Sequence, residues 1–176
     1  MTEKDELTSI IWIVNAAPFI GLAKIGRLEL LVGSGRTVYL PEIVVREIKA
    51  GPPHDAAVEA IDRFLSIGAG TMMLSASPPN SRLAKFALDA GEVAVLTEVL
   101  ARPGSVAVID DGPGRAAGKS LGIPIRGTVG VLALARRQGK IPALAPELRG
   151  LQAAGLYLPR EDVLRGLLSA MGEDWP

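Results

Sequence analysis

Four carboxylic acids occupy positions where they can act together: Glu47, Glu92, Asp110 and Asp111. The two aspartates follow SVAVI, an apolar run that predicts a buried strand, while both glutamates border apolar stripes at helical spacing. Adjacent carboxylates repel each other unless a cation lies between them, and hard divalent ions prefer oxygen ligands. The four acids are therefore candidate metal ligands. Asp111 can also simply cap the helix that follows, which would leave Asp110 without a partner.

The two glutamates have structural interpretations as well. Glu47 can pair with a basic neighbour on its own helix, either Arg46 or Lys49. Glu92 follows Asp89 at the spacing of a capping box, in which each side chain bonds to the other residue's backbone. A ligand at a helix start would be held in place by that geometry, so the two roles of Glu92 are compatible.

Other catalytic patterns find less support. The segment 112–117 (GPGRAA) satisfies the dinucleotide pattern G-x-G-x-x-A, but two acids directly precede the loop that would receive an anionic pyrophosphate. A P-loop is excluded because its first glycine would be Pro113. His54 is the only histidine and is expected at a surface helix start, so Ser-His-Asp catalysis and histidine-rich metal sites have little basis.

Strands and helices alternate along the chain. Apolar runs predict strands at 10–14, 37–40, 71–74, 105–109 and 123–125. Helical spacing predicts helices at 19–31, 41–51, 54–67, 81–100 with an interruption at 89–91, 113–121, 128–138, 145–154 and 160–171. This alternation predicts an α/β fold with a mostly parallel central sheet and helices on both faces, in which ligands gather at the carboxyl ends of the strands. We expect one domain, 1–176, with 142–176 as appended C-terminal helices.

Composition sets further bounds. The 176 residues are 48% hydrophobic and 22% charged, which is typical of a folded domain and not of a disordered one. Without cysteine there are no disulfides or thiolate metal sites, and a reducing, cytoplasmic setting fits. Aromatic residues make up only 4%, so phosphate or shape contacts are expected in preference to base stacking. Residues 1–9 lack the pattern of a secretory signal and no apolar run approaches about 18 residues, so we expect a soluble protein with no membrane partner.

The charge distribution changes sign along the chain. Up to Asp111 there are 10 Lys or Arg and 14 Asp or Glu, and from Gly112 onward there are 9 and 5. A metal-dependent nuclease can use such an arrangement, with carboxylates for ions and basic residues for phosphates. Random variation of the surface explains it equally well.

The chain resembles the PIN-like family of small bacterial and archaeal proteins, which are related to the nucleases of toxin–antitoxin pairs. The resemblance rests on the order and spacing of VNAAPFIGLAKIGRLELL, LPEIVVREI, LDAGEVAVL, VIDDGPGRAAGKSLGIPIRGTVGVLALARRQGKI and LQAAGLYLPREDVLRGLLSAMGE. It implies a three-layer α/β/α sandwich in which acids at the sheet edge bind one or two Mg²⁺ or Mn²⁺. These ions would activate water to cut an RNA phosphodiester.

The family's acids correspond to Glu47, Glu92 and Asp110, with Asp111 as an adjacent candidate. The resemblance further implies that basic residues hold the RNA backbone and that a hydroxyl orients a ligand or water; the candidates are Arg115, Lys119, Arg126 and Thr128. It also makes a cognate antitoxin a candidate partner, and the appended helices make a homodimer reasonable.

One position departs from the family pattern. The first strand should end in aspartate, and this chain has Asn15, which offers a carbonyl oxygen without charge. Loss of an anionic ligand should weaken metal binding. Three explanations remain open: drift with residual activity, a degenerate protein that binds nucleic acid or a partner, or a substitution made to express a toxic nuclease. A ribonuclease is the leading hypothesis, a non-catalytic binding protein the second and a nucleotide-binding α/β protein the third.

Overall fold

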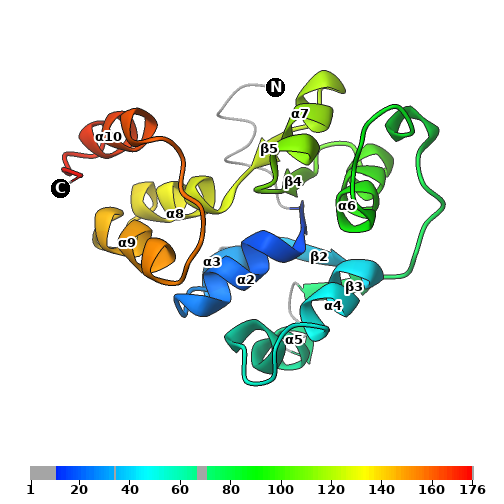
Figure 1. The fold of residues 1–176 in the computed structure, drawn as a ribbon, viewed down its shortest axis with the longest axis horizontal. Coiled ribbons are helices and arrows are strands. Elements are labelled where there is room, and N and C mark those ends of the chain that lie inside the picture. The colour runs from blue at the N-terminus through cyan, green and yellow to red at the C-terminus, as the bar shows by residue number, and fades with distance from the viewer. Residues whose placement is uncertain (1–10, 34, 67–70, 176) are drawn as a thin grey trace.

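A computed structural model describes residues 11–33, 35–66 and 71–175, and Figure 1 shows their arrangement. Five strands form a single sheet: β1 (Ile11–Val14), β2 (Thr37–Pro41), β3 (Thr71–Leu74), β4 (Val106–Val108) and β5 (Ile125–Arg126). Their order is β3-β2-β1-β4-β5, and every pair of neighbours is parallel. The expected α/β fold with a parallel sheet is thus confirmed. Position 10 of the predicted first strand, position 67 of a predicted helix and residues 1–9 lie outside the described residues.

Helices connect and cover the strands on both faces of the sheet, giving three layers (Figure 1). Helix α6 packs on β1, β2 and β4 beside α7, whereas α2 and α3 contact α8 on the other side. The helices are α2 (Ala16–Lys24), α3 (Glu29–Val32), α4 (Glu42–Lys49), α5 (Ala56–Ser66), α6 (Ala90–Ala101), α7 (Gly112–Ser120), α8 (Thr128–Arg137), α9 (Ala145–Ala153) and α10 (Glu161–Ser169). None of the described helices is long and apolar enough to cross a membrane.

Two predicted helices are wrong in extent. The helix expected over 19–31 is divided into α2 and α3, because Gly26 takes a positive φ of 67° that breaks the α-helical path. The helix expected from residue 81 is only a short 3₁₀ turn at Ser81–Leu83, and the regular helix starts at Ala90. A local helical pattern of apolar residues cannot reveal such breaks, since the same side chains also pack from turns.

Aliphatic side chains fill the core, as the low aromatic content requires. Trp12 and Phe19 are fully buried exceptions, and the Phe19 ring meets Phe64 edge to face with centroids 5.1 Å apart. Strands β1 and β4, at the centre of the sheet, are apolar on both faces because helices cover both. Strand β3 lies at the sheet edge and leaves Met72 and Met73 half exposed.

The C-terminal helices are fastened by two charged contacts. Glu147 of α9 accepts two hydrogen bonds from Arg27 Nε at 3.1 Å and one from Nη2 at 2.7 Å. Glu173, after α10, accepts hydrogen bonds from the backbone N–H groups of Leu144 at 2.7 Å and Ala145 at 2.9 Å, at the start of α9. Arg136 of α8 also donates to Glu173, at 2.8 Å. These contacts hold the C-terminal end of the chain against α8 and α9.

Candidate functional site

The site lies at the carboxyl edge of the sheet, where two neighbouring strands deliver polar residues. Val14 of β1 is in register with Val108 of β4, and Asn15 continues the pairing by donating its N–H to the Val108 carbonyl at 2.9 Å. Asp110 follows two residues after the end of β4. Asn15 and Asp110 are therefore brought to one edge, as expected for parallel strands.

Asn15 and Glu47 meet at Gly91, the second residue of α6. A Cβ atom at position 91 would lie 2.7 Å from Glu47 Oε2 and 2.8 Å from Asn15 Oδ1. Only glycine leaves room for both oxygens at these distances. Asn15 is 3% exposed, and its Oδ1 has no hydrogen-bond partner. A buried side-chain oxygen without a protein donor is uncommon, and such an oxygen is available to accept a hydrogen bond from water or to coordinate a cation.

Glu47 does not form the alternative ion pairs with its neighbours. Arg46 instead pairs with Glu42, and Lys49 pairs with Asp62 at 2.6 Å. Glu47 is exposed as a residue, but partial burial of its carboxyl raises the pKa and the negative charge of Asp89 raises it further, while a hydrogen bond from the Gly91 backbone partly offsets both effects. A cation would relieve this unfavourable environment of the carboxylate.

Glu92 is buried and connects two helices. Asp89 and Glu92 form the predicted capping box, with Glu92 N donating to Asp89 Oδ1 at 2.7 Å and Asp89 N donating to Glu92 Oε2 at 3.0 Å. The second carboxylate oxygen, Oε1, accepts from Gly114 N of α7 at 2.7 Å. A negative charge is thus held between the N-termini of α6 and α7, where the helix dipoles favour it.

Asp110 is held by hydrogen bonds from Thr128. Its two oxygens accept from Thr128 N at 2.7 Å and from Thr128 Oγ1 at 2.5 Å. Gly127 is the N-cap residue of α8, and the hydroxyl of Thr128, the first residue of that helix, faces the acidic edge. Asp111 is the N-cap residue of α7 without a capping bond from its side chain. The two adjacent aspartates therefore differ, since one is fixed and the other is exposed.

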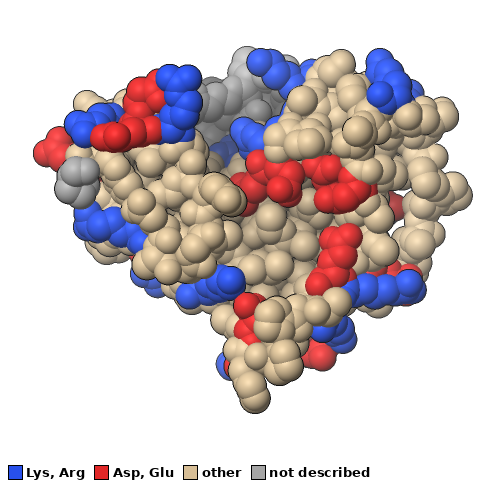
Figure 2. Space-filling model, viewed as in Figure 1, with Lys and Arg blue, Asp and Glu red and all other residues tan. Residues whose placement is uncertain are grey.

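Asp89 is an acid that the sequence indicated only as a helix cap. Asp111 is exposed as a residue, but partial burial of its carboxyl and the negative charges of Asp110 and Asp89 raise its pKa, and the charge of Asp89 also raises the pKa of Glu47. Asp89 therefore belongs to the same electrostatic cluster as the predicted acids. Figure 2 shows carboxylates gathered across the middle of this face of the molecule. In the sequence, the only local sign of a role for Asp89 was its capping-box spacing to Glu92, and that spacing predicted helix capping and not membership of an acidic cluster.

Three helix N-termini face these acids, and in each of them one backbone amide already bonds to a carboxylate. The amides of Gly91 in α6, Gly114 in α7 and Thr128 in α8 all bond to carboxylates. A dinucleotide would need such amides for its pyrophosphate. The GPGRAA segment also lies within α7, which begins at Gly112, and not in a loop before it. This arrangement disfavours the nucleotide-binding hypothesis and favours cations.

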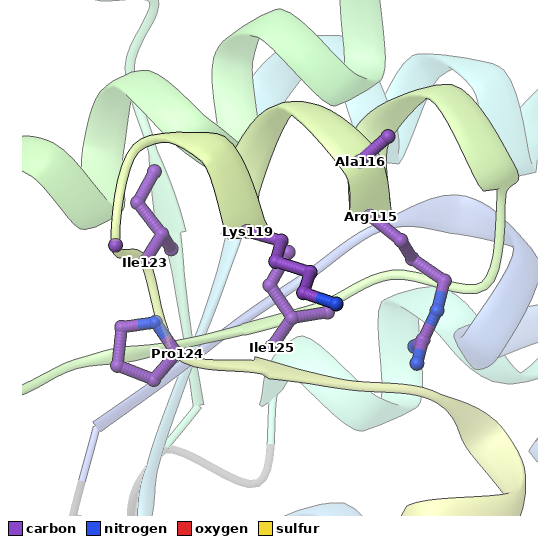
Figure 3. A pocket seen from close by; sticks show the side chains of 7 residues that line it. Arg115, Ala116, Lys119, Ile123, Pro124 and Ile125 are labelled. Atoms are coloured by element: carbon purple, nitrogen blue, oxygen red, sulfur yellow. The ribbon is translucent and has the colours of Figure 1, made fainter. Parts of the chain in front are cut away.

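The predicted basic residues lie beside the acids but are not equivalent. Arg115 and Lys119 line an open hollow of about 540 Å³ between α7 and β5, and Figure 3 shows Lys119 extending from α7 over Ile125 while Arg115 extends from the same helix to one side of it. Arg115 Nη1 donates to the carbonyl of Ile109 at 3.0 Å, which holds its guanidinium near the end of β4. Arg126 donates to the Gly130 carbonyl at 3.1 Å and lies over the Trp12 ring. Arg115 and Lys119 are thus the better placed for a phosphate.

The oxygen donors only partly complete a metal site. In the described part of the chain, no three Asp, Glu or His side chains converge closely enough to hold an ion by themselves. The unpartnered Asn15 Oδ1 and the exposed Glu47 carboxylate do fit a hard cation, because both present oxygen on the same side of Gly91. The donor set thus suits Mg²⁺ or Mn²⁺ in type, with one charge fewer than an aspartate at position 15 would give.

Comparison with known proteins decides the family. A family model described as a PIN domain matches residues 11–173, which is nearly the whole chain. The chain belongs to the PIN domain family. PIN domains have a nuclease-type fold and typically use divalent metal ions. No curated protein matches the chain.

Proposed function

We propose that this PIN domain is a ribonuclease that depends on Mg²⁺ or Mn²⁺ and hydrolyses phosphodiester bonds. The observation that carries the proposal is the buried, unpartnered Oδ1 of Asn15 beside the Glu47 carboxylate. A polar atom buried without a partner costs about 1–3 kcal/mol. Asn15 stands where the family pattern has an aspartate, and a cation bound there would supply the interaction that Oδ1 lacks.

The remaining acids support the same proposal. Asp110 and Asp111 stand at the carboxyl end of β4, and Glu92 holds a further charge between two helices. Bound there, the metal ions would supply an activated water and neutralise the phosphate. Glu47, Glu92, Asp110 and Asp111 would hold the ions together with Asn15, while the bond from Thr128 Oγ1 keeps Asp110 oriented. Arg115 and Lys119 would bind the RNA backbone beside the scissile phosphate.

Asn15 lowers the expected metal affinity and supports a second candidate. With one anionic ligand fewer and no three acids converging in the described residues, the protein can bind RNA without cutting it. The two candidates differ in what restores cleavage. An active but weakened nuclease gains activity from Asn15→Asp, whereas a binding protein that has lost more than this charge does not.

The decisive experiment measures cleavage of labelled single-stranded RNA with Mn²⁺, Mg²⁺ or EDTA. The unaltered protein should cut slowly with Mn²⁺, Asn15→Asp should cut at least about tenfold faster, and Glu47→Gln should abolish cutting. Glu59→Gln is the matched control, because Glu59 is an exposed acid on α5 that pairs only weakly with His54 at 3.4 Å. The enzyme proposal fails if neither the unaltered protein nor Asn15→Asp cuts RNA.

Biological context extends the proposal. We place this nuclease in a toxin–antitoxin pair acting in the cytoplasm, on the resemblance of its motifs to such toxins. A small protein encoded by a neighbouring gene should then co-purify with it and suppress cleavage.

We also propose a homodimer, and light scattering on the purified chain should give twice the 18.4 kDa mass. A monomeric mass would exclude the dimer without affecting the nuclease proposal.

A further inference from the structure

Tyr157 is a fully exposed aromatic residue in a chain that has very few aromatic residues. Its relative exposure is 102%, and it lies in the linker between α9 and α10. Val163 at the start of α10 is 54% exposed, so apolar surface continues beside it. A single exposed side chain needs no explanation, but an aromatic ring at the mouth of a groove is a candidate contact.

The groove beside Tyr157 leads to the candidate active site. It has a volume of about 600 Å³ and lies between β5, α8 and the two C-terminal helices. Asp110, Arg115 and Thr128 line it as polar residues, while Leu156, Leu158 and Leu167 are apolar. The same groove thus holds a charged end, which suits a phosphate and its cation, and an apolar part that suits a flat ring.

Resting on the proposed ribonuclease function, we propose that Tyr157 is a stacking platform for an unpaired base of the RNA substrate. The base lies on the Tyr157 ring, and the backbone of the same strand reaches Asp110 and Arg115. Arg115 also lines the hollow that contains Lys119, so the strand continues along α7. Phosphate contacts on α7 supply affinity without sequence information, and Tyr157 adds a contact that only a base can make.

This arrangement selects single-stranded RNA. In a duplex the faces of each base are already covered by its neighbours, so Tyr157 cannot stack without unstacking them. Any base offers a π-face, so the contact tolerates different sequences. A helix of a protein partner would also fit an apolar groove, but the Asp110 and Arg115 end connects this one to the site of phosphate chemistry.

The test measures the affinity of fluorescently labelled single-stranded RNA by anisotropy, with Ca²⁺ in place of Mg²⁺ to limit cleavage. Tyr157→Ala should raise the Kd about 5- to 150-fold, as expected for the loss of one stacked base. Tyr157→Phe should bind as the unaltered protein does, because the ring is retained. Tyr157→Leu should behave like Tyr157→Ala, since it is apolar but cannot stack. Met72→Ala is the control, because Met72 is an exposed apolar residue on the edge strand β3, away from the groove, and its loss should not change the Kd.

The outcomes separate this inference from the ribonuclease proposal. If Tyr157→Ala binds RNA normally while Arg115→Ala weakens binding, the stacking platform is wrong and the nuclease proposal stands. If Tyr157→Leu binds as well as the unaltered protein, the contact is merely apolar, as a docked helix would make, and stacking is again excluded. A base-paired RNA of the same sequence should show no dependence on Tyr157, and an equal loss with duplex would also contradict the proposal.

Discussion

Asn15 and Glu47 point their oxygens into one small space that exists only because residue 91 is glycine. The two residues come from different elements, the end of β1 and the helix α4. Because both side chains lie against residue 91, the site requires glycine at that position of α6.

Gly91→Ala should damage the site although alanine is the better helix former. The new Cβ would lie 2.7 Å from Glu47 Oε2 and 2.8 Å from Asn15 Oδ1, so one or both side chains must move. We expect a loss of about 1–3 kcal/mol in the free energy of unfolding and weaker Mn²⁺ binding. Gly166→Ala in α10 is the control, since nothing lies within 4 Å of its Cβ position. It should stabilise by about 0.5–1 kcal/mol, and similar effects at both positions would contradict the prediction.

Asn15→Asp should destabilise the metal-free protein and strengthen its response to metal. It adds a buried carboxylate beside Glu47, at an expected cost of about 1–3 kcal/mol at neutral pH in EDTA. Mn²⁺ should then raise the unfolding temperature more than it does for the unaltered protein. Denaturant unfolding with EDTA and thermal unfolding with Mn²⁺ measure both effects. Asn80→Asp is the matched control, because Asn80 caps a 3₁₀ turn where aspartate serves equally well.

Thr128→Val should release Asp110 from one of its two hydrogen bonds. Valine keeps the shape of threonine but removes the hydroxyl that lies 2.5 Å from Asp110 Oδ2. A hydrogen bond to a charged group contributes about 1.5–3 kcal/mol, so stability should fall by that order. RNA cleavage should fall as well, because Asp110 is no longer held in one orientation. Thr128→Ser should retain both properties, and equal losses in the two variants would show that the hydroxyl is not responsible.

Glu173 should make the stability of the protein depend on pH in acid. Burial alone would raise the pKa of its carboxyl, but hydrogen bonds from Ala145, Arg136 and Leu144 outweigh burial and lower the pKa. A lowered folded-state pKa means that the stabilisation is fully present above the usual glutamate range and is lost as pH falls through the folded value. Glu173→Gln should therefore cost about 1–3 kcal/mol at pH 7 and progressively less in acid.

Asp174, the exposed neighbour of Glu173, provides the control variant. Asp174→Asn should leave the free energy of unfolding nearly unchanged across the same pH range. Urea unfolding at several pH values measures both variants. A pH-independent loss in Glu173→Gln would show that the charge of Glu173 is not the cause of its contribution.

Local patterns in the sequence determined the order of elements and the details that neighbouring residues create. The apolar runs at β1 and β4 predict buried strands because both faces of a parallel sheet are covered. The capping box of Asp89 and Glu92 was equally readable, since its atoms lie within one turn of a helix. The resemblance to PIN-like proteins then brought Glu47 and Asp110 into one hypothesis that no local pattern contained.

Only the tertiary structure decided which of these groups touch. The partner of Asp110 is Thr128 and the neighbours of Asn15 are Glu47 and Gly91, and in each case the residues come from different elements. Tyr157 likewise reaches the groove of Asp110 only because α9 and α10 fold back beside α8. Contacts between distant segments depend on packing and strand register, which side-chain periodicity leaves open. The sequence therefore determined what kinds of groups line the edge of the sheet, and the fold determined which oxygens still lack a partner.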